Sequence, residues 1–132
     1  MLTSFKPANA VSDASSLVRS YAAATIGALG TQKDLEKLQR LRKTERSPTA
    51  RVGLLEAIYE LGDKSVLYDL IALTEHHNYR IRCAAVNTLG NIDLAPSDRV
   101  CVLHSLLLRM KKEPTVAVMS SLKNGIRALR AK

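Results

Sequence analysis

The stretch RIRCAAVNTLGNID, residues 80–93, carries the periodicity that decides the fold. Apolar side chains recur in it at intervals of four, four and three, at Ile81, Ala85, Leu89 and Ile92. This spacing places them on one face of an α-helix. We therefore predict a helix here with a single buried face.

Three other segments, residues 17–30, 49–62 and 117–130, follow the same template. Its apolar positions there are Val18, Ala22, Ile26 and Leu29; Ala50, Leu54, Ile58 and Leu61; and Val118, Leu122, Ile126 and Leu129. Self-similarity at a period of about 30 residues is typical of repeat proteins, in which each unit buries its apolar face against a neighbour. We expect Ile26, Ile58 and Leu89 to belong to one continuous core.

The ends of these helices carry their own signals. Three residues before each first template position stands a side chain that can cap a helix N-terminus: Ser15, Ser47, Asn78 or Thr115. Pro48 suits the first helical position. Gly30 and Gly62 follow the last apolar positions, where a left-handed residue is expected.

Between the template helices lie apolar sets that predict partner helices: Leu35, Leu38 and Leu41; Leu67, Leu70, Ile71 and Leu73; and Val102, Leu103, Leu106, Leu107 and Met110. No alternating pattern indicates a strand. The sequence therefore predicts an all-α fold, an α-solenoid of about three and a half stacked helix pairs. We expect residues 1–14 to form an N-terminal segment and residues 15–132 a single domain.

Two of the template helices carry the motif V-R-x-x-A-A-x-x-[IL]-G: residues 18–27 match it fully, and residues 81–90 match it with Ile81 in place of the valine and Val86 in place of the second alanine. This motif resembles the second helix of the short bacterial HEAT repeats found in bilin-lyase-like proteins. The resemblance covers residues 17–129 and implies HEAT-like helix pairs. The fourth template helix departs from it, with Met119 in place of the arginine and Lys123 at an apolar position.

Arg19, Arg51 and Arg82 occupy the same template position, one in each of three repeats. In the family that the motif resembles, such arginines mostly bond turn carbonyls and acidic side chains between repeats. Asp34, Asp63 and Asp93 stand near the turns as possible partners. Direct contact of these arginines with a ligand is the alternative.

The composition points to an anionic partner. Twenty Lys and Arg against twelve Asp and Glu give a formal charge of +8 and a pI near 9.8. With 4% aromatic residues and no Trp, the chain is poorly suited to stacking on bases or sugars. No long apolar run or signal peptide is apparent, so we expect a cytoplasmic protein whose Cys83 and Cys101 are buried, reduced and unpaired.

No catalytic, metal or cofactor site is evident in the sequence. Glu56 and Glu60 lie one helical turn apart, but the pattern gives no sign of the burial that would make them an acid/base pair. Cys101 and His104 could supply half of a metal site, and the remaining ligands are missing. The glycines do not form a phosphate-binding loop. We expect no enzyme activity and no cofactor.

Two surfaces are candidates for binding a partner. The first comprises positions of the template helices, the second helix of each pair, that lie outside the apolar face: Tyr21, Glu56, Tyr59, Asn87, Asn91, Asn124 and Arg127. The second is a basic rim at the turns, comprising Arg40, Arg42, Lys43, Arg46, Arg80, Arg109, Lys111 and Lys112. The tyrosines could instead cover core residues, and the rim could serve only solubility and helix-dipole stabilisation.

The leading hypothesis is a non-catalytic protein-binding module that grips or sequesters a partner with an acidic surface. A toxin-neutralising immunity protein is one example of such a module. One alternative is binding of nucleic-acid phosphates through the basic rim. Another, implied by the resemblance, is a chromophore-lyase-like subunit. Neither the sequence pattern nor the composition indicates an oligomeric state.

Overall fold

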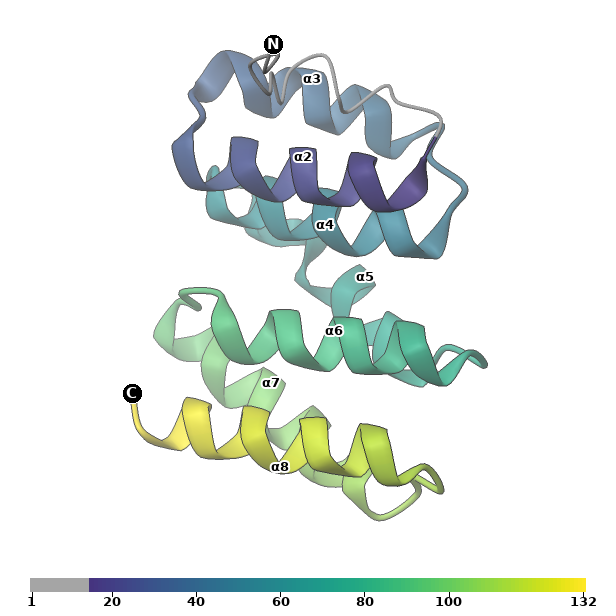
Figure 1. Cartoon of the computed structure of the whole chain (residues 1–132). Coiled ribbons are helices and arrows are strands. Elements are labelled where there is room, and N and C mark those ends of the chain that lie inside the picture. The colour runs from purple at the N-terminus through teal and green to yellow at the C-terminus, as the bar shows by residue number, and fades with distance from the viewer. Residues whose placement is uncertain (1–14) are drawn as a thin grey trace, which may run out of the picture. The chain divides into compact units, whose positions relative to one another are not determined.

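The computed structural model describes residues 15–132, and over that range the chain is helical with no strand (Figure 1). The α-helices are α2 (Ser16–Leu29), α3 (Gln32–Arg42), α4 (Pro48–Glu60), α5 (Leu67–Ala72), α6 (Tyr79–Asn91), α7 (Pro96–Met110) and α8 (Val116–Arg130). Two short 3-10 helices, η1 (Lys64–Val66) and η2 (Leu73–Glu75), flank α5. This confirms the predicted all-α fold of the α-solenoid class. The chain forms two compact units, unit 1 ending at Val66 and unit 2 comprising Leu67–Lys132.

In unit 1, helix α2 runs along α4, and α3 also packs on α4 (Figure 1). Two glycines allow α2 and α4 to approach closely. A Cβ atom at Gly27 would lie 2.6 Å from the Cα of Ala57, and one at Gly53 would overlap the backbone of Ser20. Side chains larger than hydrogen are therefore excluded at both positions.

Unit 2 repeats this arrangement with α6 along α8 and α7 packed on α8. Here the closest approach joins two glycines, since a Cβ atom at Gly90 would lie 3.0 Å from the Cα of Gly125. The partner helix predicted around residues 67–73 consists of the short helix α5 followed by η2. Helix α5 and η2 pack on α6.

The template positions form the cores of the two units. Ile58 and Leu89 are fully buried, and Ile26 is 7% exposed. Leu29 is an exception, because it is the last residue of α2 and is 81% exposed. The predicted core position of Leu29 is therefore wrong, while the other repeats bury or half-bury theirs.

The helix starts were predicted well, with one exception. The side chains of Ser15, Ser47 and Asn78 accept hydrogen bonds from first-turn N–H groups. Thr115 occupies the N-cap position of α8, but its hydroxyl accepts from the Arg82 guanidinium instead. The local capping bond predicted for Thr115 is thus replaced by a long-range one.

The predicted helix ends differ at the two glycines. Gly62 has a φ of 120°, the positive value expected of a glycine after a helix. Gly30 has a φ of −84° and is extended, so the left-handed conformation predicted there is wrong. Cys83 and Cys101 are unbonded and half-buried rather than buried. Within residues 15–132, no helix is both long and apolar enough to cross a membrane.

Candidate functional site

Arg82 connects two turns of unit 2. Its Nε and Nη2 atoms donate to the two carboxylate oxygens of Glu113 at 2.9 and 3.0 Å. Its Nη1 atom donates to the carbonyls of His76 and His77 at 2.9 and 3.0 Å. The guanidinium therefore binds the turn before its own helix α6 and the turn before α8 at the same time.

Arg19 and Arg51 occupy the same template position as Arg82, and each makes some of the equivalent contacts. Arg19 donates from Nε and Nη2 to the two carboxylate oxygens of Glu45 at 2.6 and 3.1 Å. Arg51 donates from Nη1 to the carbonyls of Arg42 and Glu45 at 3.5 and 3.4 Å. These contacts agree with the structural role expected of the arginines.

The acidic partners were not those that the sequence suggested. Asp34 accepts from the backbone of Thr31, and Asp63 accepts from Gln39 and Ser65. The glutamates that bind the arginines stand two residues before a helix N-cap, in the patterns Glu-x-Ser and Glu-x-Thr. That repeated spacing is the signal by which they could have been found.

Both glutamates have a pKa below the ordinary value of a glutamate side chain. Burial raises the pKa of Glu113, but the hydrogen bonds from Arg82, from the backbone N–H of Thr115 and from Arg109 outweigh it and leave the pKa below its ordinary value. Burial also raises the pKa of Glu45, and Arg19 and the N–H of Ser47 likewise bring it below the ordinary value. The two pairs are therefore ionic near neutral pH.

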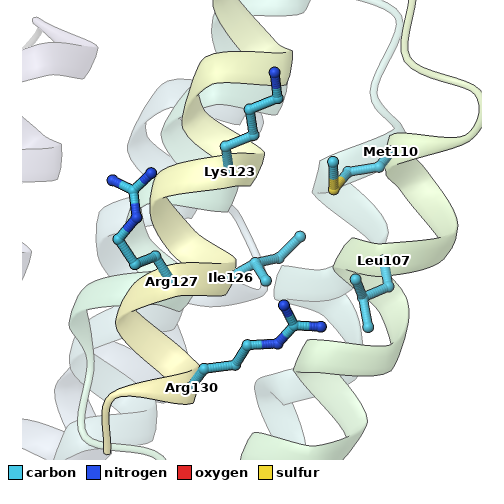
Figure 2. Close-up of a pocket in the computed structure, with 6 residues that line it drawn as sticks. All are labelled: Leu107, Met110, Lys123, Ile126, Arg127 and Arg130. Carbon is cyan, nitrogen blue, oxygen red and sulfur yellow. The ribbon is translucent and has the colours of Figure 1, made fainter.

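A groove of about 400 Å³ lies between α7 and α8 in unit 2 (Figure 2). Its residues combine an apolar floor with basic side chains: Leu107, Met110, Ile126, Lys123, Arg127 and Arg130. Leu107 and Met110 are only half-buried, although their spacing predicted core positions. None of the lining residues is acidic.

Figure 2 shows how these side chains are directed. Met110 and Ile126 point into the gap between the two helices, and Arg130 extends across it toward Leu107. Arg127 points away from α7, on the other side of α8. Arg130 is thus a cation that extends over the apolar floor, and sequence reasoning assigned it no binding role.

Three of the predicted second-helix residues come together on α6 and α8. Asn87, Asn91 and Asn124 are exposed and line a shallow depression of about 70 Å³ beside Gly90 and Gly125. The fourth predicted residue of this unit, Arg127, borders the α7/α8 groove instead, with its side chain directed away from α7. The prediction thus divides between two neighbouring surfaces of α8.

Tyr59 is not a surface residue. The structure leaves it no exposed area, and the ammonium group of Lys64 lies 4.0 Å from the centre of its ring. Its predicted role as a central partner contact is therefore wrong, and the alternative, that this tyrosine belongs to the core, is correct. Tyr21 of α2, by contrast, is 66% exposed.

Glu56 differs from its expected environment. It is half-buried in α4, and burial, with a smaller contribution from the negative charge of Glu60, raises its pKa to about 7. Burial also raises the pKa of the exposed Glu60. The sequence pattern gives no sign of this burial, because burial depends on the packing around α4 and the spacing of residues does not show it.

The basic rim residues lie at helix ends and turns, as predicted. Unit 1 holds Arg40, Arg42, Lys43 and Arg46 at the end of α3 and in the turn after it, and unit 2 holds Arg80, Arg109, Lys111 and Lys112. Arg109 also donates to Glu113 at 3.2 Å, and Arg80 donates to the hydroxyl of Tyr79 at 3.4 Å. Whether these residues bind a partner stays a prediction.

A second groove, of about 470 Å³, lies in unit 1 beside the rim residues Arg42 and Lys43. Gln39, Arg51 and Asp63 complete its lining. In the part of the chain from Ser15 onward, no three His, Cys, Asp or Glu side chains are grouped so that they could hold a metal ion.

Comparison with known proteins identifies the repeats. Residues 39–117, more than half of the chain, match a family model described as HEAT repeats. No curated protein and no solved structure matches the chain.

Proposed function

Because this chain belongs to the HEAT-repeat family, we propose that it is a non-catalytic protein-binding module that grips or sequesters an acidic partner. HEAT repeats commonly mediate protein–protein interaction and are generally non-catalytic. The observation that carries the proposal is the α7/α8 groove, where an apolar floor is surrounded by cations.

The groove offers both parts of a protein-binding site. Met110, Leu107 and Ile126 provide apolar area that a partner's aliphatic or aromatic side chain would cover. Arg130, which extends over this floor, would lose water on binding and donate to a partner carboxylate. A helical segment of a partner that carries apolar and acidic residues on the same face would cover the apolar floor and pair with Arg130.

The charge of the groove also selects against other partners. Lys123, Arg127 and Arg130 are all exposed, and no lining residue offsets their charge. Basic surfaces are therefore repelled, while acidic ones approach faster. The exposed asparagines beside Gly90 add neutral hydrogen-bonding groups on the adjacent face of α8.

Binding of nucleic-acid phosphates is the second candidate, supported by the formal charge of +8. Phosphate binding makes no use of the apolar floor, and no aromatic side chain lines the groove for stacking. We therefore rank it below protein binding. A chromophore-lyase-like subunit also ranks below protein binding, because only the resemblance to bilin-lyase-like repeats supports it. A toxin-neutralising immunity protein is one form that sequestration of a partner would take.

The experiment uses fluorescence anisotropy to measure the affinity of the protein for a labelled amphipathic helical peptide. Leu and Glu residues alternate along the binding face of this peptide from one helical turn to the next. Arg130→Gln should weaken binding at least about fivefold, since a desolvated charged hydrogen bond is lost. Arg99→Gln is the matched control, because it removes the same charge from α7 outside the groove and should change affinity less than about twofold.

Salt dependence separates the two candidates. The same titration with a DNA duplex should give weaker binding, with a logarithmic affinity that falls steeply with logarithmic salt concentration. Tighter binding of DNA than of the peptide, or equal losses in Arg130→Gln and Arg99→Gln, would contradict the proposed function. The natural partner can then be sought by capture from native lysate with and without nuclease.

A further inference from the structure

Three asparagine side chains of unit 2 line the shallow depression between α6 and α8. Asn87 and Asn91 belong to α6 and Asn124 to α8, and all three are exposed. Within residues 15–132, none of these three carboxamides makes a hydrogen bond to another residue. A carboxamide offers two N–H donors and an acceptor oxygen. Each side chain can therefore bind a ligand group that presents one acceptor and one donor.

Two glycines bring the helices together at the floor of this depression. A Cβ atom at Gly90 would lie 3.0 Å from the Cα of Gly125, and Ala128 completes the lining. Because the floor carries no long side chain, the backbone of a ligand can approach it closely. The depression measures about 70 Å³, against about 400 Å³ for the α7/α8 groove. It therefore accepts a backbone with small side chains rather than a bulky side chain.

The repeat template places these amides in unit 2. Asn124 stands at the template position of Asn87. The template positions of Asn87 and Asn91 hold Glu56 and Glu60 in α4 and alanines in α2. An ionised carboxylate accepts hydrogen bonds but donates none, and the side chain of alanine does neither. Among the template helices from Ser16 to Arg130, only α6 and α8 thus carry amides at these positions.

The three amides are spaced like the polar groups of an extended chain. Asn87 and Asn91 stand four residues apart, which is about 6 Å along a helix axis. Two residues of an extended chain span about 6.6 Å. Helices α6 and α8 run in the same direction (Figure 1). Because Gly125 lies opposite Gly90, Asn124, one residue earlier, lies at a level between the two asparagines of α6.

An extended backbone matches this alternation between the two helices. In a strand, the N–H and C=O groups of one residue point to the same side, and those of the next residue point to the opposite side. Two residues that are two positions apart can thus face α6, while the residue between them faces α8. Each of the three presents one donor and one acceptor, which is the pair that a carboxamide binds.

We propose that this depression binds an extended segment of a partner protein through its backbone. Asn87 and Asn91 each pair with the N–H and C=O groups of a residue that faces α6, and Asn124 pairs with the residue between them. No lining residue is charged, so the site favours a neutral main chain over a phosphate or a carboxylate. The segment carries small residues, such as Gly, Ala or Ser, where it faces the glycine floor.

This inference rests on the proposed function only in that the partner is a protein. It uses none of the residues of the α7/α8 groove, and the affinity of the amphipathic peptide for that groove does not depend on the asparagines. Failure of one site in its own experiment therefore leaves the other site in place.

The test titrates ¹⁵N-labelled protein with an acetylated and amidated heptapeptide of alternating Thr and Ser, and it follows the asparagine side-chain NH2 signals by NMR. The signals of Asn87, Asn91 and Asn124 should shift and saturate together. The signal of Asn78 should stay in place, because this side chain caps α6 outside the depression. An analogue whose three central amides are replaced by esters lacks the N–H donors and should bind at least about threefold more weakly.

Variants measure the contribution of the individual amides. Asn91→Ala and Asn124→Ala should each weaken binding of the heptapeptide at least about threefold, since two hydrogen bonds to its backbone are lost. Alanine favours a helix more than asparagine does, so both variants should fold, and circular dichroism checks this. His104→Ala is the control, because it removes an exposed polar side chain from α7 outside the depression and should leave the affinity unchanged.

Two further titrations distinguish other classes of ligand. Added salt should leave binding of the heptapeptide nearly unchanged, because the hydrogen bonds join neutral groups. The oligosaccharide maltotriose should cause no comparable shift of the three asparagine signals. Four results would overturn the proposal: no shift with the heptapeptide, equal binding of the ester analogue, equal losses in Asn91→Ala and His104→Ala, or larger shifts with maltotriose than with the heptapeptide.

Discussion

Arg82 and Glu113 form a two-point ion pair across 31 residues of sequence, and the Glu113 side chain has no exposed surface. The Glu113 carboxylate also receives hydrogen bonds from Arg109 and from the backbone of Thr115. Removing the acid therefore leaves several donors unsatisfied around Arg82, which is itself buried.

We expect Glu113→Gln to lower the free energy of unfolding by about 3–5 kcal/mol, the usual result of breaking a buried pair. Glu45→Gln is the matched variant, and it should lose only about 1–2 kcal/mol, since its pair with Arg19 is partly exposed. Urea unfolding at pH 7 measures both. Equal losses would show that burial does not distinguish the two pairs.

The lowered pKa values of Glu113 and Glu45 also set the acid response. Their contribution to stability is complete above the ordinary glutamate pKa of 4.5 and is lost as the pH falls through the lower folded values. The difference in stability between the wild type and Glu113→Gln should therefore shrink below about pH 4.5. A difference that is constant from pH 7 to pH 3 would contradict the ionic pairing.

Glu56 should give the opposite pH dependence. Its pKa is raised from 4.5 to about 7, mainly by burial, so its charged form destabilises the folded state. This penalty is absent below the unfolded pKa and complete above the folded one. Glu56→Gln should therefore stabilise the protein by about 1–3 kcal/mol at pH 8 and by much less at pH 5. Thermal unfolding at the two pH values measures the change, and equal stabilisation at both would be inconsistent with a raised pKa.

Leu89 and Leu29 occupy two of the apolar template positions but differ in burial. Leu89 is fully buried, and Leu89→Ala should cost about 2–5 kcal/mol. Leu29 is 81% exposed, and Leu29→Ala should change stability by no more than about 0.5 kcal/mol. Chemical denaturation compares them directly. A loss below about 1 kcal/mol for Leu89→Ala would exclude Leu89 from the core.

Tyr59 and Tyr21 provide a similar comparison on α4 and α2. Because Tyr59 is fully buried, Tyr59→Ala should destabilise the fold by about 3–5 kcal/mol. Tyr21 is 66% exposed, and Tyr21→Ala should leave stability within about 0.5 kcal/mol of the wild type. Thermal melts of both variants measure this. A stable Tyr59→Ala variant would restore the interpretation of Tyr59 as a surface contact.

The fold was predictable because its determinants are local. The spacing of Ile81, Ala85 and Leu89 defines a helix face within a few residues, and caps such as Ser47 act on the adjacent turn. The candidate site was less predictable, because it depends on which residues of different helices meet. The burial of Tyr59 and the groove beneath Arg130 arise from such contacts, and the helical period alone does not contain them.

The hydrogen bond from Arg82 to the Thr115 hydroxyl ties the start of α8 to a residue that is distant in the sequence. Both α4 and α8 have a glutamate before the N-cap that is paired with an arginine of another helix, but only α4 also has a local cap, in which the Ser47 side chain accepts from the first turn. The start of α8 instead depends on Arg82, which binds the Thr115 hydroxyl and the Glu113 carboxylate from α6. The first turn of α8 should therefore open together with its contact to α6, which makes the α6–α8 pair one cooperative unit in hydrogen exchange.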